Sequence, residues 1–109
     1  MYLKKSDIST RQAQVLKAVV EDYIIDHVPI GSNVLKKKHA FNYSPATLRH
    51  TMANLEKKNL LMHTYTSSGR IPTDLGYRYY VDHLMRQSDI ELENYANVEN
   101  KLHQSSNSI

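Results

Sequence analysis

Apolar residues recur at three- and four-residue steps along the first part of the chain, a pattern typical of an amphipathic helix. Residues 9–12 fit a capping box, with Ser9 as the N-cap and Gln12 three residues later. The pattern predicts a helix that runs to about His27, before Pro29 and Gly31 interrupt it. Its inward stripe is expected to consist of Leu16, Val19, Val20, Tyr23 and Ile24.

Two shorter helices are expected next. Ser32 is predicted to cap a helix that ends near His39, with Val34 and Leu35 turned inward. A four-residue connection, residues 40–43, leads to Ser44, which caps a third helix whose first position is Pro45. Two helices joined by so short a turn are typical of a helix-turn-helix, in which the second helix is the recognition helix.

The third helix has two contrasting faces. Leu48, Met52 and Leu55 share the apolar face. Thr47 and Arg49 lie on the flanks of this helix. The opposite, outer face carries Ala46, His50, Ala53, Asn54 and Lys57.

A short hairpin and a fourth helix follow. We expect a strand over residues 60–65, a turn over 66–69 and a return strand over 70–72, with Gly69 and Arg70 at the tip. Thr73 and Asp74 open the fourth helix, in which Gly76 is a mild penalty. The apolar stripe of this helix is expected to be Tyr77, Tyr80, Val81 and Leu84.

These elements predict a mainly α fold with a small β-hairpin. The architecture is a winged helix-turn-helix, with a three-helix core and a wing, followed by a fourth helix and an acidic helical tail. We expect residues 1–87 to form the DNA-binding domain and residues 88–109 to form the tail, frayed at its end. A second capping box at residues 88–91 opens that tail.

The amino-acid composition excludes several kinds of site and several classes of protein. The 109 residues suit one domain, and the absence of Cys excludes disulfides and Cys-based zinc or redox sites. The six His are scattered, so no metal and no cofactor is expected. No spacing of catalytic groups favours an enzyme. No apolar run approaches the ~20 residues of a membrane span, and the start lacks the apolar block of a signal peptide, so a cytoplasmic protein without membrane contact is expected.

Charge is distributed unevenly along the chain. Residues 1–86 hold 13 Lys and Arg against 7 Asp and Glu, whereas residues 87–109 hold one Lys and four acids. Between Ser32 and Thr73 there are seven Lys and Arg and a single acid, Glu56. This concentration favours a polyanionic partner, while a solvated lysine-rich surface is the alternative for Lys36–Lys38 alone.

The side chains of the third helix suit the edges of DNA bases. Arg49 can donate a fork of hydrogen bonds to guanine, His50 and Asn54 can bond other bases, and small or methyl-bearing side chains can approach thymine. An ion pair with Glu56 or Glu21 is the alternative for Arg49, and plain exposure is the alternative for His50. The predicted base-reading set is Ser44, Ala46, Thr47, Arg49, His50 and Asn54.

The hairpin and the lysines complete the predicted interface. An Arg at a hairpin tip has few intramolecular partners and suits a narrow minor groove, so the wing set is Ser68, Gly69 and Arg70. Phosphate contacts hold a protein in register without reading sequence. About six to eight such contacts would give a salt slope of roughly −5 to −7. The predicted phosphate set is Ser32, Lys36, Lys37, Lys38, Lys57 and Lys58.

Several ordered motifs carry a resemblance to a known family. The segments 20–24, 29–32, 44–49, 66–74 and 76–82 read VEDYI, PIGS, SPATLR, TSSGRIPTD and GYRYYVD. Over residues 9 to about 86 the chain resembles the amino-terminal domain of the bacterial heat-inducible transcription repressors of the HrcA type. Two positions depart from that pattern. His50-Thr51 stands where the family usually has Asn-Glu, and Ala40 stands where a Gly usually ends the second helix.

The resemblance implies a repressor of chaperone operons that binds double-stranded DNA at an inverted repeat as a dimer. It also implies release of DNA when chaperonin is occupied by misfolded protein, and a bacterial, nucleoid-associated location. The family continues beyond this length into a regulatory region, so a homodimer is expected only with that carboxyl-terminal region. The dimer surfaces within this chain would be the stripes at 77–84 and 92–102.

Other functions stay open from the sequence alone. A winged helix can serve as a protein-interaction module, although such a module needs no basic recognition face. RNA binding is compatible with the same basic charge, and a stand-alone DNA-binding relative without heat-shock regulation is also compatible.

Overall fold

The computed structural model describes residues 3–64 and 67–85, without the side chains of Ser67 and Ser68. A short 3-10 helix, η1, precedes three α-helices, a two-stranded hairpin, a fourth α-helix and a π-helical segment, η2. In chain order the elements are η1 (Lys5–Asp7), α1 (Thr10–Asp26), α2 (Ser32–His39), α3 (Pro45–Lys57), β1 (Leu61–Thr64), β2 (Ser67–Pro72), α4 (Asp74–Tyr79) and η2 (Tyr80–Met85).

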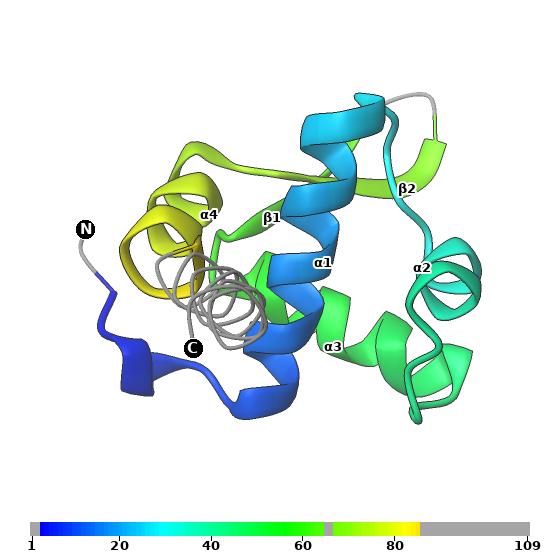
Figure 1. The fold of residues 1–109 in the computed structure, drawn as a ribbon, viewed down its shortest axis with the longest axis horizontal. Coiled ribbons are helices and arrows are strands. Elements are labelled where there is room, and N and C mark those ends of the chain that lie inside the picture. Colours follow the sequence, from blue (N-terminus) through cyan, green and yellow to red (C-terminus); the bar gives the residue numbers. More distant parts are fainter. Residues whose placement is uncertain (1–2, 65–66, 86–109) are drawn as a thin grey trace, which may run out of the picture.

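Helix α1 runs through the middle of the molecule, between α4 and α2 in the view of Figure 1. Its side chains Val15, Leu16 and Val19 are fully buried. The apolar face of α3 packs against it, and the hairpin adds its first residues to the same core. The predicted class, a winged helix-turn-helix, is thus confirmed for the described residues. Also fully or almost fully buried are Val20, Leu35, Leu48, Met52, Leu55, Leu60 and Leu61.

Hydrogen bonds at the helix starts follow the sequence closely. The Ser9 N–H donates to Gln12 Oε1 at 2.9 Å and the Gln12 N–H donates to Ser9 Oγ at 3.1 Å, which is the predicted capping box. Ser44 and Thr73 cap α3 and α4 in the predicted way. The cap of α2 differs, because Gly31 is its N-cap and Ser32 is already its first helical residue.

Three apolar side chains that we expected to be buried are exposed. They are Ile24, Val34 and Val81, with exposed fractions of 49%, 51% and 48%. Val34 is exposed because the eight-residue α2 buries only Leu35. Val81 is exposed because the wider π-helical turn of η2 shifts the buried face to Tyr79, Tyr80 and Leu84.

The hairpin turns earlier than predicted. Strand β1 pairs antiparallel with β2, with Leu61 opposite Pro72, His63 opposite Arg70 and Thr64 opposite Ser67. Gly69 and Arg70 therefore lie inside β2, and placing them at the tip was wrong. The reason is a tertiary contact, since the backbone of Arg70 exchanges two 2.9 Å hydrogen bonds with Ile30, in the loop before α2.

Gly76 is a requirement of the fold rather than the mild penalty that we expected. A Cβ atom at this position would lie 2.1 Å from the carbonyl oxygen of Leu60. Only glycine lets the first turn of α4 come so close to the residue that precedes β1. The acidic tail and its capping box lie outside the described residues. No helix among the described residues has the length and apolar character needed to cross a membrane.

Candidate nucleic-acid interface

Helix α3 presents a polar, largely exposed outer face. Ala46, Arg49, His50 and Lys57 are exposed, while Thr47, Ala53 and Asn54 are half-buried. The buried side chains Leu48, Met52 and Leu55 fix the opposite face in the core, as predicted. The helix is therefore anchored by one side and offers the other to a partner.

Hydrogen bonds hold the first turn of α3. Ser44 Oγ accepts from the Thr47 N–H at 3.1 Å and donates to Thr47 Oγ1 at 3.0 Å. Thr51 is buried and its hydroxyl donates to the Thr47 carbonyl at 2.9 Å. Of the pair that departs from the family pattern, only His50 lies on the outer face, because Thr51 belongs to the core.

A groove of about 520 Å³ lies beside Arg49. Its walls come from the start of α2, from α3 and from the hairpin, three elements that the predicted interface uses. Among the described residues, Arg49 has no hydrogen-bond or ion-pair partner. The alternative ion pair with Glu56 or Glu21 is not formed, so the Arg49 guanidinium is available. The groove is lined by Pro29, Gly31, Ser32, Asn33, Val34, Arg49, His63, Gly69 and Arg70.

The Glu56 carboxylate binds two basic side chains of the hairpin rather than Arg49. Arg70 Nε donates to Glu56 Oε1 at 2.9 Å, and His63 Nδ1 lies 2.9 Å from the same carboxylate. The hydrogen bond from Arg70, and then that from His63, lower the pKa of Glu56 below its usual value. The Arg70 side chain is only 11% exposed. The premise that Arg70 has few intramolecular partners was therefore wrong.

One signal in the sequence pointed to this cluster, and the prediction missed it. Glu56 is the single acid within the basic stretch from Ser32 to Thr73, which favours pairing with a basic side chain of that stretch. We weighed this pairing for Arg49 but not for Arg70 or His63. The pairing of His63 with Arg70 across the hairpin then decides which side chains reach it.

Three of the five lysines in the predicted phosphate set have intramolecular partners. Lys36 Nζ donates to the Phe41 carbonyl, and Lys38 Nζ binds Asp26 Oδ2 at 2.6 Å. The hydrogen bond to Asp26 raises the pKa of Lys38. Lys58 Nζ points to the amino-terminal segment, where it donates to the Asp7 carbonyl at 2.7 Å. Lys37 and Lys57 are exposed and have no such partner among the described residues.

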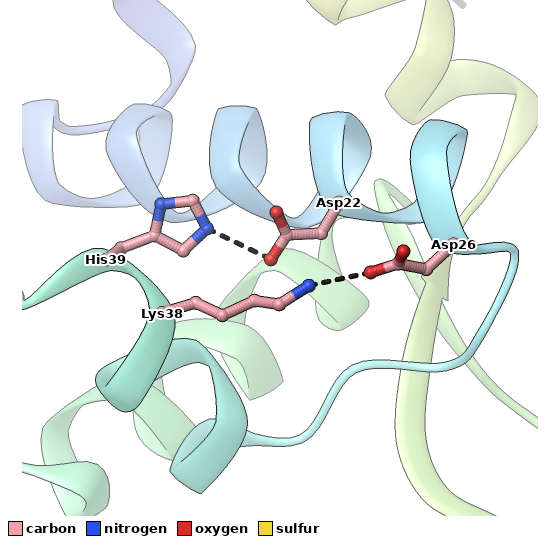
Figure 2. Close-up of polar contacts among 4 residues, drawn as sticks. All are labelled: Asp22, Asp26, Lys38 and His39. Carbon is pink, nitrogen blue, oxygen red and sulfur yellow. Dashed lines mark hydrogen bonds and ion pairs between the residues drawn. The ribbon is translucent and has the colours of Figure 1, made fainter.

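Figure 2 shows the polar junction between α1 and α2. His39 Nε2 lies 2.9 Å from Oδ2 of the buried Asp22, next to the pair of Lys38 with Asp26. Two carboxylates on α1 thus bind two consecutive residues at the end of α2. This junction fixes α2, and hence the turn that leads into α3.

The remaining predicted site residues have these positions. Gly69 and Arg70 line the groove from β2, Ser32 lines it from α2, and the Ser68 side chain lies outside the described part. The structure brings Arg49, Ser32, Gly69 and Arg70 together, whereas Lys38 and Lys58 are tied to other parts of the chain. Within the described residues, no group of three or more His, Asp and Glu could hold a metal ion.

Curated relatives of the chain share one name. The chain is 45% identical over 83 residues to "Heat-inducible transcription repressor HrcA" of Lysinibacillus sphaericus. It is 51% identical over 83 residues to the protein of the same description from Mycoplasma pneumoniae. Both matches cover 76% of this chain and 24% of the relative, so the chain spans about a quarter of the length of these repressors. No protein-family model matches the chain.

Solved structures share the fold. The crystal structure of a hypothetical protein is 32% identical, with a TM-score of 0.71 over 76% of this chain and 27% of that one. The crystal structure of MepR, a transcription regulator of the Staphylococcus aureus multidrug efflux pump MepA, is 18% identical. Its TM-score is 0.52 over 95% of this chain and 81% of that one. The second likeness concerns the winged-helix fold alone.

Proposed function

Because the chain is an HrcA-type amino-terminal domain in sequence and has a winged-helix fold, we propose that it is the DNA-binding module of a heat-inducible transcription repressor. Its partner is double-stranded DNA, and its operator is an inverted repeat. The relatives are transcription regulators, a role that involves no catalysis.

One observation carries the proposal. Arg49 projects beside a groove that α2, α3 and the hairpin share, and it has no partner among the described residues. The single acid between Ser32 and Thr73, Glu56, binds Arg70 and His63 instead. An unpaired guanidinium on an exposed helix is the arrangement that forks onto guanine O6 and N7 in a major groove.

Within this proposal the predicted residues have different roles. The base-reading residues are Ser44, Ala46, Thr47, Arg49, His50 and Asn54, with Arg49 as the principal one. Lys37 and Lys57 bind phosphates, and Ser32 supports them from the start of α2. Lys36, Lys38 and Lys58 contribute mainly through the positive field, because their ammonium groups already have partners. Ser68, Gly69 and Arg70 form the wing side of the interface.

The larger assembly is also part of the proposal. Residues 1–87 act as the DNA-binding domain and residues 88–109 as a tail or linker. A homodimer forms through a carboxyl-terminal region like that of the longer relatives, and chaperonin acts on that full-length form. The protein works in the bacterial cytoplasm, associated with the nucleoid.

A binding comparison tests the proposal. The chain is titrated by gel shift against duplex DNA, single-stranded DNA and RNA, with the preferred duplex selected from a random pool. We expect duplex DNA to bind most tightly. Arg49→Ala should lose ~1–3 kcal/mol on the selected duplex and little on random duplex, while Lys57→Ala should weaken both alike.

Two outcomes would contradict this assignment. If Arg49→Ala and Lys57→Ala behave alike on both duplexes, Arg49 is not the reading residue. If no nucleic acid binds, the fold serves as a protein-interaction module.

A further inference from the structure

We propose that Glu56 is a positioning residue, which holds the wing in the orientation that DNA binding by α3 requires. The proposal rests on the proposed function and adds a role that the residue type does not suggest. An acid on a surface that meets phosphates ordinarily weakens binding. Here the acid instead joins the recognition helix to the wing.

The geometry places Glu56 at a joint between three elements. It lies in the last turn of α3, while His63 lies in β1 and Arg70 in β2. His63 and Arg70 are opposite one another in the hairpin, so their side chains project from the same face. Both reach one carboxylate, at 2.9 Å each. The carboxylate thus ties both strands of the wing to the recognition helix.

The backbone around Arg70 restricts the wing from the other side. The N–H and carbonyl of Arg70 bond to Ile30, and a Cβ at Gly69 would lie 2.9 Å from the backbone of Pro29. Strand β2 is therefore pressed against the loop before α2 along one edge. The side chain of Arg70 fixes the remaining freedom, the tilt of the hairpin toward α3.

The tilt matters because the hairpin is one wall of the groove beside Arg49. His63, Gly69 and Arg70 line that wall, and Arg49 stands on the wall that α3 provides. A change in the tilt changes the distance between the reading residue and the wing. Both parts can contact one duplex only when that distance is fixed, which is the advantage of a preorganised site.

The decisive experiment uses a substitution whose charge effect and positioning effect have opposite signs. Glu56→Gln removes negative charge from a surface that binds a polyanion, so charge alone predicts equal or tighter binding. Our proposal predicts an affinity for the selected duplex that is lower by roughly tenfold, about the loss of one charge-assisted hydrogen bond. A lower affinity, measured by fluorescence anisotropy at fixed salt, therefore supports the positioning role.

A matched control removes a different acid. Asp82→Asn removes the same charge from η2, which lines no part of the groove beside Arg49. It should change the duplex affinity by no more than about twofold. Arg70→Lys is the second variant, since it keeps the positive charge and loses the Nε–H that binds Glu56. It should make the hairpin amides exchange faster, as Glu56→Gln does, and it carries the test by that DNA-free measurement if Glu56→Gln does not fold.

Amide hydrogen exchange gives a readout that needs no DNA. In Glu56→Gln the amides of β1 and β2 should exchange faster, while those in the middle of α1 keep their protection. Equal or tighter DNA binding by Glu56→Gln overturns the proposal, and so does unchanged exchange in the hairpin. If the wild-type chain binds no duplex, the proposed function fails by itself, and hairpin exchange still decides whether Glu56 holds the wing.

Discussion

Three non-glycine residues with a positive φ end helices in the described chain. They are His27 after α1, Ala40 after α2 and Asn59 after α3, with φ values of 55°, 49° and 63°. A left-handed conformation costs an ordinary L-residue roughly 1–2 kcal/mol, and Asn tolerates it better than Ala does. Ala40, which ends α2, is therefore more strained than Asn59, which follows α3. Ala40 also lies in the turn that sets the direction of α3.

Replacing Ala40 by Gly should stabilise the protein by about 0.5–1 kcal/mol. Glycine relieves the strain at φ 49°, and part of that gain is offset by the larger entropy of the unfolded chain. Urea unfolding followed by circular dichroism measures the change. Asn59→Gly is the matched control at φ 63° and should gain less. A lower stability for Ala40→Gly would show that the turn carries no strain.

At the scale of elements, close backbone contacts decide how the hairpin meets its neighbours. The Thr73 N–H donates to the Leu60 carbonyl at 3.1 Å, and Gly76 lies over the same carbonyl. Thr73 Oγ1 also donates to the Asn59 carbonyl at 2.5 Å. The end of α3 and the start of α4 are thereby held together on either side of the hairpin.

Gly76→Ala should destabilise the fold by ~1–3 kcal/mol, the usual cost of forcing extra volume into a packed site. The added methyl would meet a backbone carbonyl, which cannot move aside as a flexible side chain can. Gly31→Ala is the control, because nothing lies within 4 Å of its added Cβ and only the N-cap preference changes. Thermal or urea unfolding compares the two variants. Equal stability of both variants would contradict the close approach of α4 to Leu60.

The joint between α3 and the hairpin should weaken in acid. The pKa of Glu56 is lowered in the folded protein, mainly by Arg70 and then by His63, so the unfolded chain binds more protons there. Its contribution to stability is complete above the unfolded pKa of ~4.5 and is lost as the pH falls through the lower folded value. Wild type should thus lose more stability than Glu56→Gln when urea unfolding is repeated between about pH 6 and pH 3. Parallel losses in both proteins would show that Glu56 has an ordinary pKa.

At the scale of the whole molecule, the internal partners of the lysines reduce the charge available to DNA. With Lys36, Lys38 and Lys58 engaged, about three to five phosphate contacts remain per domain, and the log affinity should fall with log salt with a slope of roughly −3 to −4.5. A titration from about 50 to 200 mM salt measures it. A slope of about −6 would show that the engaged lysines leave their partners when DNA binds, and a slope near zero would exclude DNA binding.

Dimerisation should not come from the stripe at residues 77–84. Tyr80 and Leu84 are in the core, which leaves Tyr77 half-buried and Val81 exposed. We expect sedimentation to give a monomer at micromolar concentration. Fusing two domains should raise the affinity for two inverted half-sites by ~10²–10⁴ over one half-site, if the linker spans both. A stable dimer of the free chain would contradict this and point to the stripe at 92–102, which lies outside the described residues.

Much of the fold follows from the sequence because its signals act over short distances. A capping box needs only Ser9 and Gln12, three residues apart, and the apolar stripe of α3 needs only a helical period. The helix bounds, the three-helix core and the outer face of α3 were predictable for this reason. Arg49, on a flank of that face, was predicted to contact bases, with an ion pair to Glu56 or Glu21 as the alternative; among the described residues that ion pair is not formed.

Partners that are distant in sequence were decided only by the tertiary structure. Arg70 lies 14 residues from Glu56, and Lys58 lies 51 residues from Asp7, so no local pattern links them. Gly76 is likewise unfavourable by helix propensity, and only its tertiary contact with the Leu60 carbonyl shows why a glycine is required there. Long charged side chains have many possible partners in an unfolded chain, and packing of the apolar core selects among them. The sequence alone therefore determined which helix can face a partner, whereas tertiary packing determined which basic residues of the proposed interface have partners inside the protein.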